Sequence, residues 1–372
     1  MIKYLFLYSI LCLLLFLAAC ESLTTKPQIN NVQVGSRPYY LIDQLNEGDL
    51  KNTLQNCQEG PFYKTDFSIG HRGAPLQFPE HTEESYRAGA RMGAGILECD
   101  VTFTKDKELV CRHSQCDLHA TTNILTIPSL AKKCTIPFTP ADLKNGIDAQ
   151  AKCCTSDITL SEFKMLKGKM DGFNTKATTI KEYIAGTPKF RTNLYSNTGT
   201  LMTHAQSITL FKQLNVKMTP ELKAPQVNMP FNGFSQQDYA DKMLSEYAQA
   251  NVPAEQVFPQ SFNLNDIKHW LNTSPKFAKQ AIFLDERERN NYFDPMKPST
   301  FEPTMDELVN TGVNTLAPPI WMLITTDEQN NIIPSVYAKA AKLAGLQIIA
   351  WTFERSGNYN EGGGWYYQSV ES

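Results

Sequence analysis

From residue 66 onward, short apolar runs alternate with amphipathic segments, and this alternation is the strongest constraint on the fold. The strands predicted from it are 66–70, 95–103, 216–222, 257–262, 281–285, 313–317 and 346–353, and the helices are 82–92, 203–214, 236–249, 264–271, 303–311 and 334–344. Repeated β-α units place parallel strands in one sheet with helices outside it. The sequence therefore predicts an α/β protein, either a (β/α)₈ barrel or an open doubly wound sheet.

We favour the barrel because its polar residues lie at strand ends, where barrel enzymes build their active sites. A closed barrel needs one strand more than the seven predicted here, and the chain stops soon after glycines 362–364. We therefore expect the closing strand to be missing, as in a fragment; the alternative is that a different segment closes the barrel. Residues 61–372 form the expected barrel domain, with an irregular insertion at about 115–200.

The N-terminus has the pattern of a secretory signal peptide over residues 1–19. Lys3 precedes an apolar run at 5–17, which is too short for a comfortable membrane span. Leu17-Ala18-Ala19-Cys20 resembles a bacterial lipobox, which predicts lipidation of Cys20 and a polar, irregular tether over 20–60. We expect export across the inner membrane and anchoring in the outer membrane, facing the periplasm or the cell surface. The alternative is a plain signal peptide.

Composition excludes some partners. The net charge of −3 and the lack of basic runs argue against nucleic-acid binding, so a local cluster must hold any anionic substrate. Seven cysteines follow Cys20, and four of them lie in the insertion, where we expect one or two disulfides of undetermined pairing. A zinc site is the rival interpretation, but no CxxC pair supports it.

The first two strands carry the densest chemical signal. His71 and Arg72 follow the first strand, and Glu98 and Asp100 share one face of the second because strand side chains alternate. Two carboxylates on an inner face favour a hard divalent cation with oxygen ligands. Cys99 points to the opposite face.

Residues 101–113 predict a β-hairpin, because a dozen residues are too few for a parallel crossover. A turn near Asp106 and Lys107 would set His113 opposite Asp100. On the third main strand, Glu221 and Lys223 share a face, so an acid and a phosphate-binding cation could point inward together.

These residues resemble the ordered motifs of the glycerophosphodiester phosphodiesterase family, a PLC-like TIM barrel, in its bacterial lipoprotein form. The matching motifs are His71-Arg72-Gly73-Ala74, Pro79-Glu80-His81-Thr82, Glu98-Cys99-Asp100-Val101, Thr104-Lys105-Asp106, His113, Glu221-Leu222-Lys223 and Ala350-Trp351-Thr352. The resemblance implies a divalent metal, Ca²⁺ or else Mg²⁺, on Glu98, Asp100 and Glu221. It also implies catalysis by His71 and His113 and phosphate contacts from Arg72 and Lys223.

Two departures from the family pattern stand out: His81 replaces a usual Asn, and Ser114 replaces a usual Asp after His113. We expect Trp351 and Phe262 either to line the substrate pocket or to pack in the core. The remaining histidines, His81 among them, are interpreted as structural or surface residues, and Thr82 as a helix N-cap.

The predicted reaction is hydrolysis of a small glycerophosphodiester to sn-glycerol 3-phosphate and an alcohol. One histidine acts as base toward the neighbouring glycerol hydroxyl and the other as acid toward the leaving alcohol. Two alternatives remain open. One is a phospholipase D-like activity on lysophospholipids or other phospholipids, and the other is a lipoprotein that binds phosphodiesters without turnover.

Overall fold

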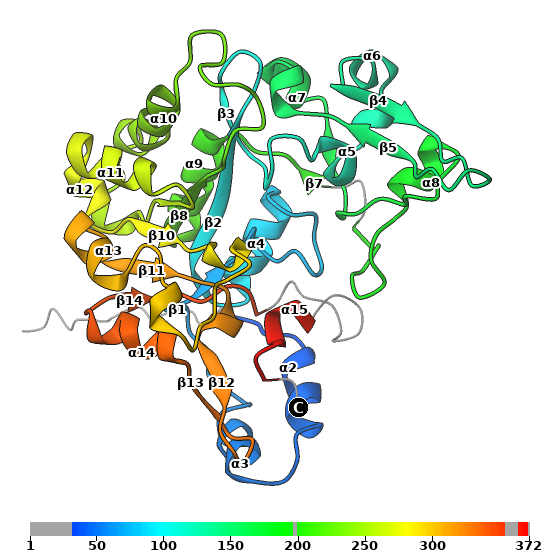
Figure 1. The fold of residues 1–372 in the computed structure, drawn as a ribbon. Helices are drawn as coiled ribbons and strands as arrows, with labels where there is room; N and C mark the ends of the chain where they lie inside the picture. Colours follow the sequence, from blue (N-terminus) through cyan, green and yellow to red (C-terminus); the bar gives the residue numbers. More distant parts are fainter. Residues whose placement is uncertain (1–31, 196–198, 354–363, 371–372) are drawn as a thin grey trace, which may run out of the picture.

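The computed structural model describes residues 32–195, 199–353 and 364–370, and its centre is a curled sheet of seven parallel strands (Figure 1). Their spatial order is β1-β2-β8-β9-β10-β11-β14. The strands are β1 (Thr65–Gly70), β2 (Ala94–Phe103), β8 (Lys217–Leu222), β9 (Gln260–Ser261), β10 (Ile282–Leu284), β11 (Thr315–Ala317) and β14 (Gln347–Ile348). Sheet and helices alternate along the chain as predicted, in an incomplete (β/α)₈ barrel.

Helices cover the outer side of this sheet. They are α4 (Glu83–Arg91), α9 (His204–Leu214), α10 (Gln236–Gln249), α11 (Leu264–Thr273), α12 (Pro275–Ala278), α13 (Met305–Thr311) and α14 (Val336–Leu343). Thr82 caps α4 as predicted, because its hydroxyl accepts a hydrogen bond from the Ser85 amide at 3.3 Å. The main core lies between sheet and helices, and a smaller apolar cluster around Ile282 and Leu284 fills the inside of the curl.

The open edges of the sheet are β1 and β14, and the described ranges contain no eighth parallel strand between them. Phe67 on β1 is 97% exposed, as expected for a strand without a neighbour on one side. Strands β9 and β14 are shorter than predicted, since only isolated bridges at Val257 and Trp351 extend the pairing beyond them.

The hairpin after β2 exists, but its predicted register is wrong by one residue. Strand β3 (Leu109–Cys111) pairs Cys111 with Val101, so Arg112, not His113, lies opposite Asp100 and donates its amide to the Asp100 carbonyl at 2.8 Å. The cause is a three-residue loop in which Lys107 adopts a left-handed φ of 65°.

The insertion is a compact lobe beside the barrel with its own apolar core (Figure 1). Its elements are α5 (Leu118–Thr121), η1 (Ile124–Thr126), α6 (Pro128–Ala131), β4 (Ile136–Thr139), β5 (Gln150–Lys152), η2 (Thr155–Asp157), α7 (Leu160–Phe163), β6 (Lys167–Gly168), α8 (Ile180–Ile184) and β7 (Gly199–Thr200). Disulfides Cys116–Cys154 and Cys134–Cys153 hold it together, as the cysteine cluster predicted. The sequence analysis predicted an irregular insertion, whereas the structure shows short helices and strands in it.

Short elements complete the described chain. Two helices, α2 (Arg37–Asp43) and α3 (Asp49–Gln55), occupy part of the segment predicted to be irregular, with a proline in the first turn of α2. The others are η3 (Ala254–Gln256), η4 (Arg287–Arg289), η5 (Pro298–Thr300), η6 (Ile320–Met322), the hairpin of β12 (Ile324–Thr326) and β13 (Ile332–Pro334), and α15 (Gly364–Tyr367). Across these described ranges, no helix combines the length and apolar character that a membrane crossing requires.

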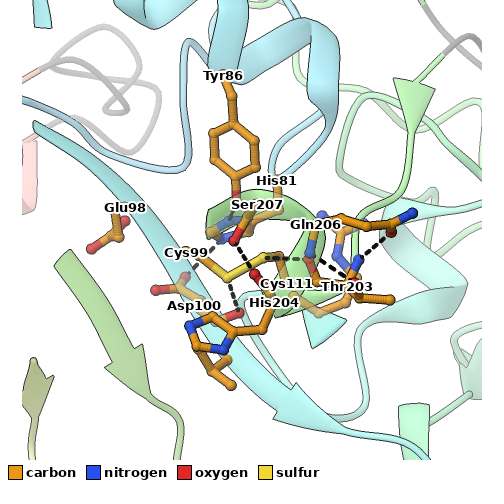
Figure 2. Close-up of a disulfide and its surroundings, with 12 residues drawn as sticks. His81, Tyr86, Glu98, Cys99, Asp100, Cys111, Thr203, His204, Gln206 and Ser207 are labelled. Carbon is orange, nitrogen blue, oxygen red and sulfur yellow. Dashed lines mark hydrogen bonds and ion pairs between the residues drawn. A yellow bond between two sulfur atoms is a disulfide. The ribbon is translucent and has the colours of Figure 1, made fainter. Parts of the chain in front are cut away.

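A third disulfide, Cys99–Cys111, joins β2 to the hairpin strand and was not predicted (Figure 2). Both cysteines are fully buried and separated by 12 residues in sequence. A crosslink of this span stabilises chiefly by restricting the unfolded chain. It fixes the strand of the acidic pair to the segment that leads to His113.

We expect the double substitution Cys99→Ala and Cys111→Ala to lower the free energy of unfolding by about 3 kcal/mol, from the loop entropy that the crosslink removes. Urea denaturation without reductant measures this change. Cys57→Ser is the matched control, because Cys57 is exposed and unpaired. Equal stability of the double variant and the wild type would contradict the prediction.

Candidate active site

The loop after β1 carries His71 and Arg72 at the carboxyl end of the strand, the end where barrel enzymes place their active sites. Arg72 has a left-handed φ of 58°, and its amide donates to Glu98 Oε2 at 3.0 Å. Gly73 follows with φ 93°, and a Cβ there would lie 2.6 Å from the Ser85 backbone. Only glycine fits that position, so geometry requires Gly73 in the His-Arg-Gly sequence.

Three acidic side chains converge next to this loop. Glu98 and Asp100 come from the inner face of β2, and Glu221 comes from β8, where the register pairs Asp100 with Glu221. One carboxylate oxygen of each lies within 4.8 Å of the other two, and all three residues are buried. The structure therefore brings together the three acids that sequence analysis selected.

One buried and one half-buried cation partly compensate these acids. Lys223 Nζ lies 2.5 Å from Glu221 Oε1, and Arg72 Nε lies 3.7 Å from Asp100 Oδ2. Burial, together with its acidic neighbours, raises the pKa of Glu98 well above its usual range and that of Glu221 to about 7. Asp100 is the exception, because Lys223, His81 and Arg72 outweigh burial and hold its pKa well below the usual range. The site thus has an excess of acid over base.

His81 was interpreted as structural or surface, yet it contacts a central acid. Its Nε2 lies 2.9 Å from Asp100 Oδ2, and its Nδ1 lies 2.9 Å from the Tyr86 hydroxyl, with all three residues fully buried (Figure 2). Burial lowers the pKa of His81 and raises that of Tyr86. The comparison with the family motif showed only that His81 stands where Asn is usual, and it did not indicate this contact.

Gln260 is a second residue that sequence analysis missed. It lies on β9, is 5% exposed, and donates from Nε2 to Glu98 Oε1 at 2.7 Å. With the Arg72 amide on the other oxygen, both oxygens of Glu98 accept a hydrogen bond. Nothing in the local sequence around Gln260 signals a contact that spans 162 positions.

The two predicted catalytic histidines lie near different acidic side chains. His71 Nε2 is 3.6 Å from Glu98 Oε2, and its Nδ1 is 3.0 Å from the hydroxyl of Thr352, beyond the end of β14. His113 has a ring nitrogen within 4.8 Å of carboxylate oxygens of Glu80 and Asp117. Burial, aided by Arg72 and Lys223, lowers the pKa of His113 well below its usual value.

Asp117 lies beside His113, with a carboxylate oxygen within 4.8 Å of a His113 ring nitrogen. Its Oδ2 accepts a hydrogen bond from the Ser114 amide at 2.9 Å. Burial raises its pKa to about 6. Glu80 is neutralised on the opposite side by Arg72, whose Nη1 lies 3.0 Å from Glu80 Oε2.

Phe262 and Trp351 lie near the phosphate-binding candidates. Their rings meet edge to face with centroids 6.0 Å apart, inside the curl of the sheet. Lys223 Nζ is 6.0 Å from the centroid of Phe262, and Trp351 Nε1 donates to the Ala317 carbonyl at 2.8 Å. Both residues therefore pack in the inner apolar cluster, and Phe262 also borders Lys223 of the polar site.

Comparison with known proteins agrees with this arrangement. Residues 71–361 match the model of the glycerophosphoryl diester phosphodiesterase family. A protein of Arthroderma benhamiae named extracellular protein is 44% identical over 206 residues, covering 54% of this chain and 82% of the relative. Glycerophosphodiester phosphodiesterase GDPD6 of Arabidopsis thaliana is 23% identical over 344 residues, covering 84% and 83%.

Among solved structures, a Silicibacter pomeroyi protein assigned as a glycerophosphoryl diester phosphodiesterase has the same fold. The TM-score is 0.53 at 17% identity, covering 79% of this chain and 84% of that one. This chain therefore belongs to the glycerophosphoryl diester phosphodiesterase family, as the sequence motifs predicted. Its class is that of a phosphoric diester hydrolase, built on an incomplete TIM barrel.

The family generally depends on a divalent metal, and the donor set of this chain fits one. Three buried carboxylates meet at one point, and Asp100 Oδ1 is buried without a hydrogen-bond partner. Such an unpaired oxygen is costly without a ligand. A cation there would also relieve the repulsion that raises the pKa of Glu98 and Glu221.

Proposed function

We propose that this protein hydrolyses small glycerophosphodiesters to sn-glycerol 3-phosphate and an alcohol, with a divalent metal and two histidines. The observation that carries the proposal is the convergence of Glu98, Asp100 and Glu221 beside the loop of His71 and Arg72. Membership of the phosphodiesterase family supports the reaction class.

Glu98, Asp100 and Glu221 would hold the metal, with Ca²⁺ as the proposed ion and Mg²⁺ as the other candidate, because both prefer carboxylate oxygens. When bound, the cation supplies positive charge against the negative charge that develops on the phosphoryl oxygens. Arg72 and Lys223 flank the same acids and contact the phosphate in our proposal. The planar guanidinium of Arg72 suits a two-point phosphate contact.

In this proposal, His71 and His113 transfer the protons. His71 removes the proton from the glycerol hydroxyl next to the phosphate, and the resulting oxygen attacks phosphorus to form a cyclic phosphate. His113 gives its proton to the departing alcohol as the P–O bond breaks. Water then opens the ring with the two roles exchanged, which restores both histidines.

The surroundings of His113 support its role as acid. Burial, aided by Arg72 and Lys223, lowers its pKa in the protein alone. A phosphodiester bound between these cations brings a negative charge that offsets them, and the carboxylates of Glu80 and Asp117 lie close to the ring. Substrate binding therefore favours the imidazolium that a general acid needs.

We also propose that the protein acts outside the cytoplasm. Residues 1–19 serve as a signal peptide and Cys20 carries a lipid anchor, with 20–60 as the tether to a barrel domain over 61–372. These first residues lie outside the described part of the chain until residue 32. The similarity to a relative named extracellular protein supports export.

Replacing His71 or His113 with Ala is expected to lower kcat for glycerophosphocholine by about 10²- to 10⁴-fold, because each removes one proton-transfer group. Calcium affinity measured by calorimetry should stay close to wild type in both variants. His269→Ala is the matched control, since His269 pairs with Asp241 on a surface helix. Near-normal turnover in either active-site variant would end the assignment of a histidine pair.

Removal of bound metal with a chelator is expected to abolish release of glycerol phosphate, and added Ca²⁺ should restore it more fully than Mg²⁺. The same assay with lysophosphatidylcholine tests the phospholipase D-like alternative. Metal-free protein, verified by elemental analysis, that retains full turnover would contradict the metal site. Binding of glycerophosphocholine without any release of product would favour the non-catalytic alternative.

Cys20→Ser should move the protein from the membrane fraction to the soluble fraction of a bacterial host, because the variant loses the acylated side chain. Immunoblotting of the two fractions measures this shift, and mass spectrometry of the mature N-terminus detects the lipid directly. Membrane association that is unchanged in Cys20→Ser would refute the anchor and leave the hydrolase proposal intact.

A further inference from the structure

His81 links helix α4 to the central acid of the proposed metal site. Its ring lies between Asp100 Oδ2 and the Tyr86 hydroxyl, each 2.9 Å away, and all three side chains are fully buried (Figure 2). The chain of contacts runs Tyr86–His81–Asp100. It begins on α4, passes through the loop after β1 and ends on β2.

Hydrogen-bond chemistry constrains the directions in this chain. A carboxylate only accepts, so His81 Nε2 must carry the proton that bonds Asp100. In the tautomer with its single proton on Nε2, Nδ1 has a lone pair that accepts from the Tyr86 hydroxyl. Tyr86 is itself held in place, because its ring meets Phe211 of α9 edge to face with centroids 4.8 Å apart.

This chain of hydrogen bonds leaves the two oxygens of Asp100 in different situations. Oδ2 is taken by His81, whereas Oδ1 is buried and has no hydrogen-bond partner. The bond to Oδ2 limits rotation of the carboxylate and so holds Oδ1 in one place. Asp100 offers one carboxylate oxygen to the cluster that it forms with Glu98 and Glu221, and Oδ1 is the oxygen that His81 does not occupy.

The backbone conformation at position 81 limits which residues can make the hydrogen bond to Asp100. Its φ of 55° lies in the left-handed region, where Asn, Asp and His are enriched among residues other than glycine. Its amide also donates to the Arg72 carbonyl at 3.1 Å, which ties the conformation to the His-Arg loop. A histidine therefore meets the backbone requirement and adds a second ring nitrogen, which reaches Tyr86.

We propose that His81 is a positioning residue for the metal: it orients Asp100 as a ligand, and Tyr86 fixes the tautomer of His81 that does so. The inference rests on the proposed metal site. Partners of this kind, which orient a ligand from behind, typically change metal affinity by about 10- to 100-fold when they are removed.

The experiment measures Ca²⁺ affinity by calorimetry on metal-free protein. His81→Gly removes the donor while accepting the left-handed backbone, and should weaken Ca²⁺ binding by about 10- to 100-fold. His81→Asn tolerates the same backbone and keeps an N–H donor, so it should recover most of that affinity. Tyr86→Phe leaves the donor in place and should weaken binding less, in the same direction.

Two controls come from a similar buried arrangement away from the acids. His204 is fully buried and bonds Glu246 at 2.8 Å, and the Tyr247 hydroxyl is buried without a hydrogen-bond partner. His204→Ala and Tyr247→Phe should leave Ca²⁺ affinity unchanged even where thermal stability falls. These variants separate an effect on the metal site from a general loss of packing.

Wild-type Ca²⁺ affinity in His81→Gly, or an equal loss in His204→Ala, would overturn the positioning role. If His81→Gly does not fold, the Tyr86→Phe variant provides the test. An unchanged Ca²⁺ affinity in Tyr86→Phe overturns the argument that Tyr86 fixes the tautomer of His81. Failure of the proposed function looks different. Wild-type protein that binds Ca²⁺ through Asp100, loses it in His81→Gly and yet hydrolyses no glycerophosphodiester would sustain this inference and refute the reaction.

Discussion

Three carboxylates buried within reach of one another are the constraint on which the rest of the site depends. Placing Glu98, Asp100 and Glu221 together in a medium of low dielectric constant is unfavourable unless positive charge lies close by. The protein supplies Lys223 and Arg72, two cations against three carboxylates, and burial together with the neighbouring acids raises the pKa of Glu98 and Glu221. A site that is short of positive charge is suited to a cation and an anionic substrate bound together.

The fold meets this constraint through strand register and loop geometry. The parallel pairing of β2 with β8 sets Asp100 beside Glu221, and the loop after β1 returns the Arg72 amide to Glu98. Each carboxylate also has its own partner: Gln260 on β9 for Glu98, His81 before α4 for Asp100, and Lys223, two residues along the chain, for Glu221. The acids are therefore held by several elements of the barrel, and no single loop carries them all.

The sequence predicted those features of the fold and the site that depend on local periodicity. Alternation along a strand is enough to put Glu98 and Asp100 on one face and Cys99 on the other, and the β-α rhythm located the seven strands. The sequence did not predict those features of the site that depend on contacts between distant parts of the chain. The contacts of His81 and Gln260 with the acids depend on tertiary packing that no local pattern encodes. The hairpin register failed because Lys107 adopts a left-handed conformation without the glycine that usually signals it.

Strand β2 serves two functions on its two faces. The inward side carries ligands and the outward side carries a sulfur that is covalently bound to Cys111. Because the side-chain period of a strand is two, inserting or deleting one residue within β2 would exchange these faces and turn an acid toward the apolar core. The crosslink anchors the outward face, so it also opposes any slip of the strand in the folded state. Strand β2 can therefore accept substitutions but not insertions or deletions. The acidic side chains fix its length on the inward face, and the disulfide fixes it on the outward face.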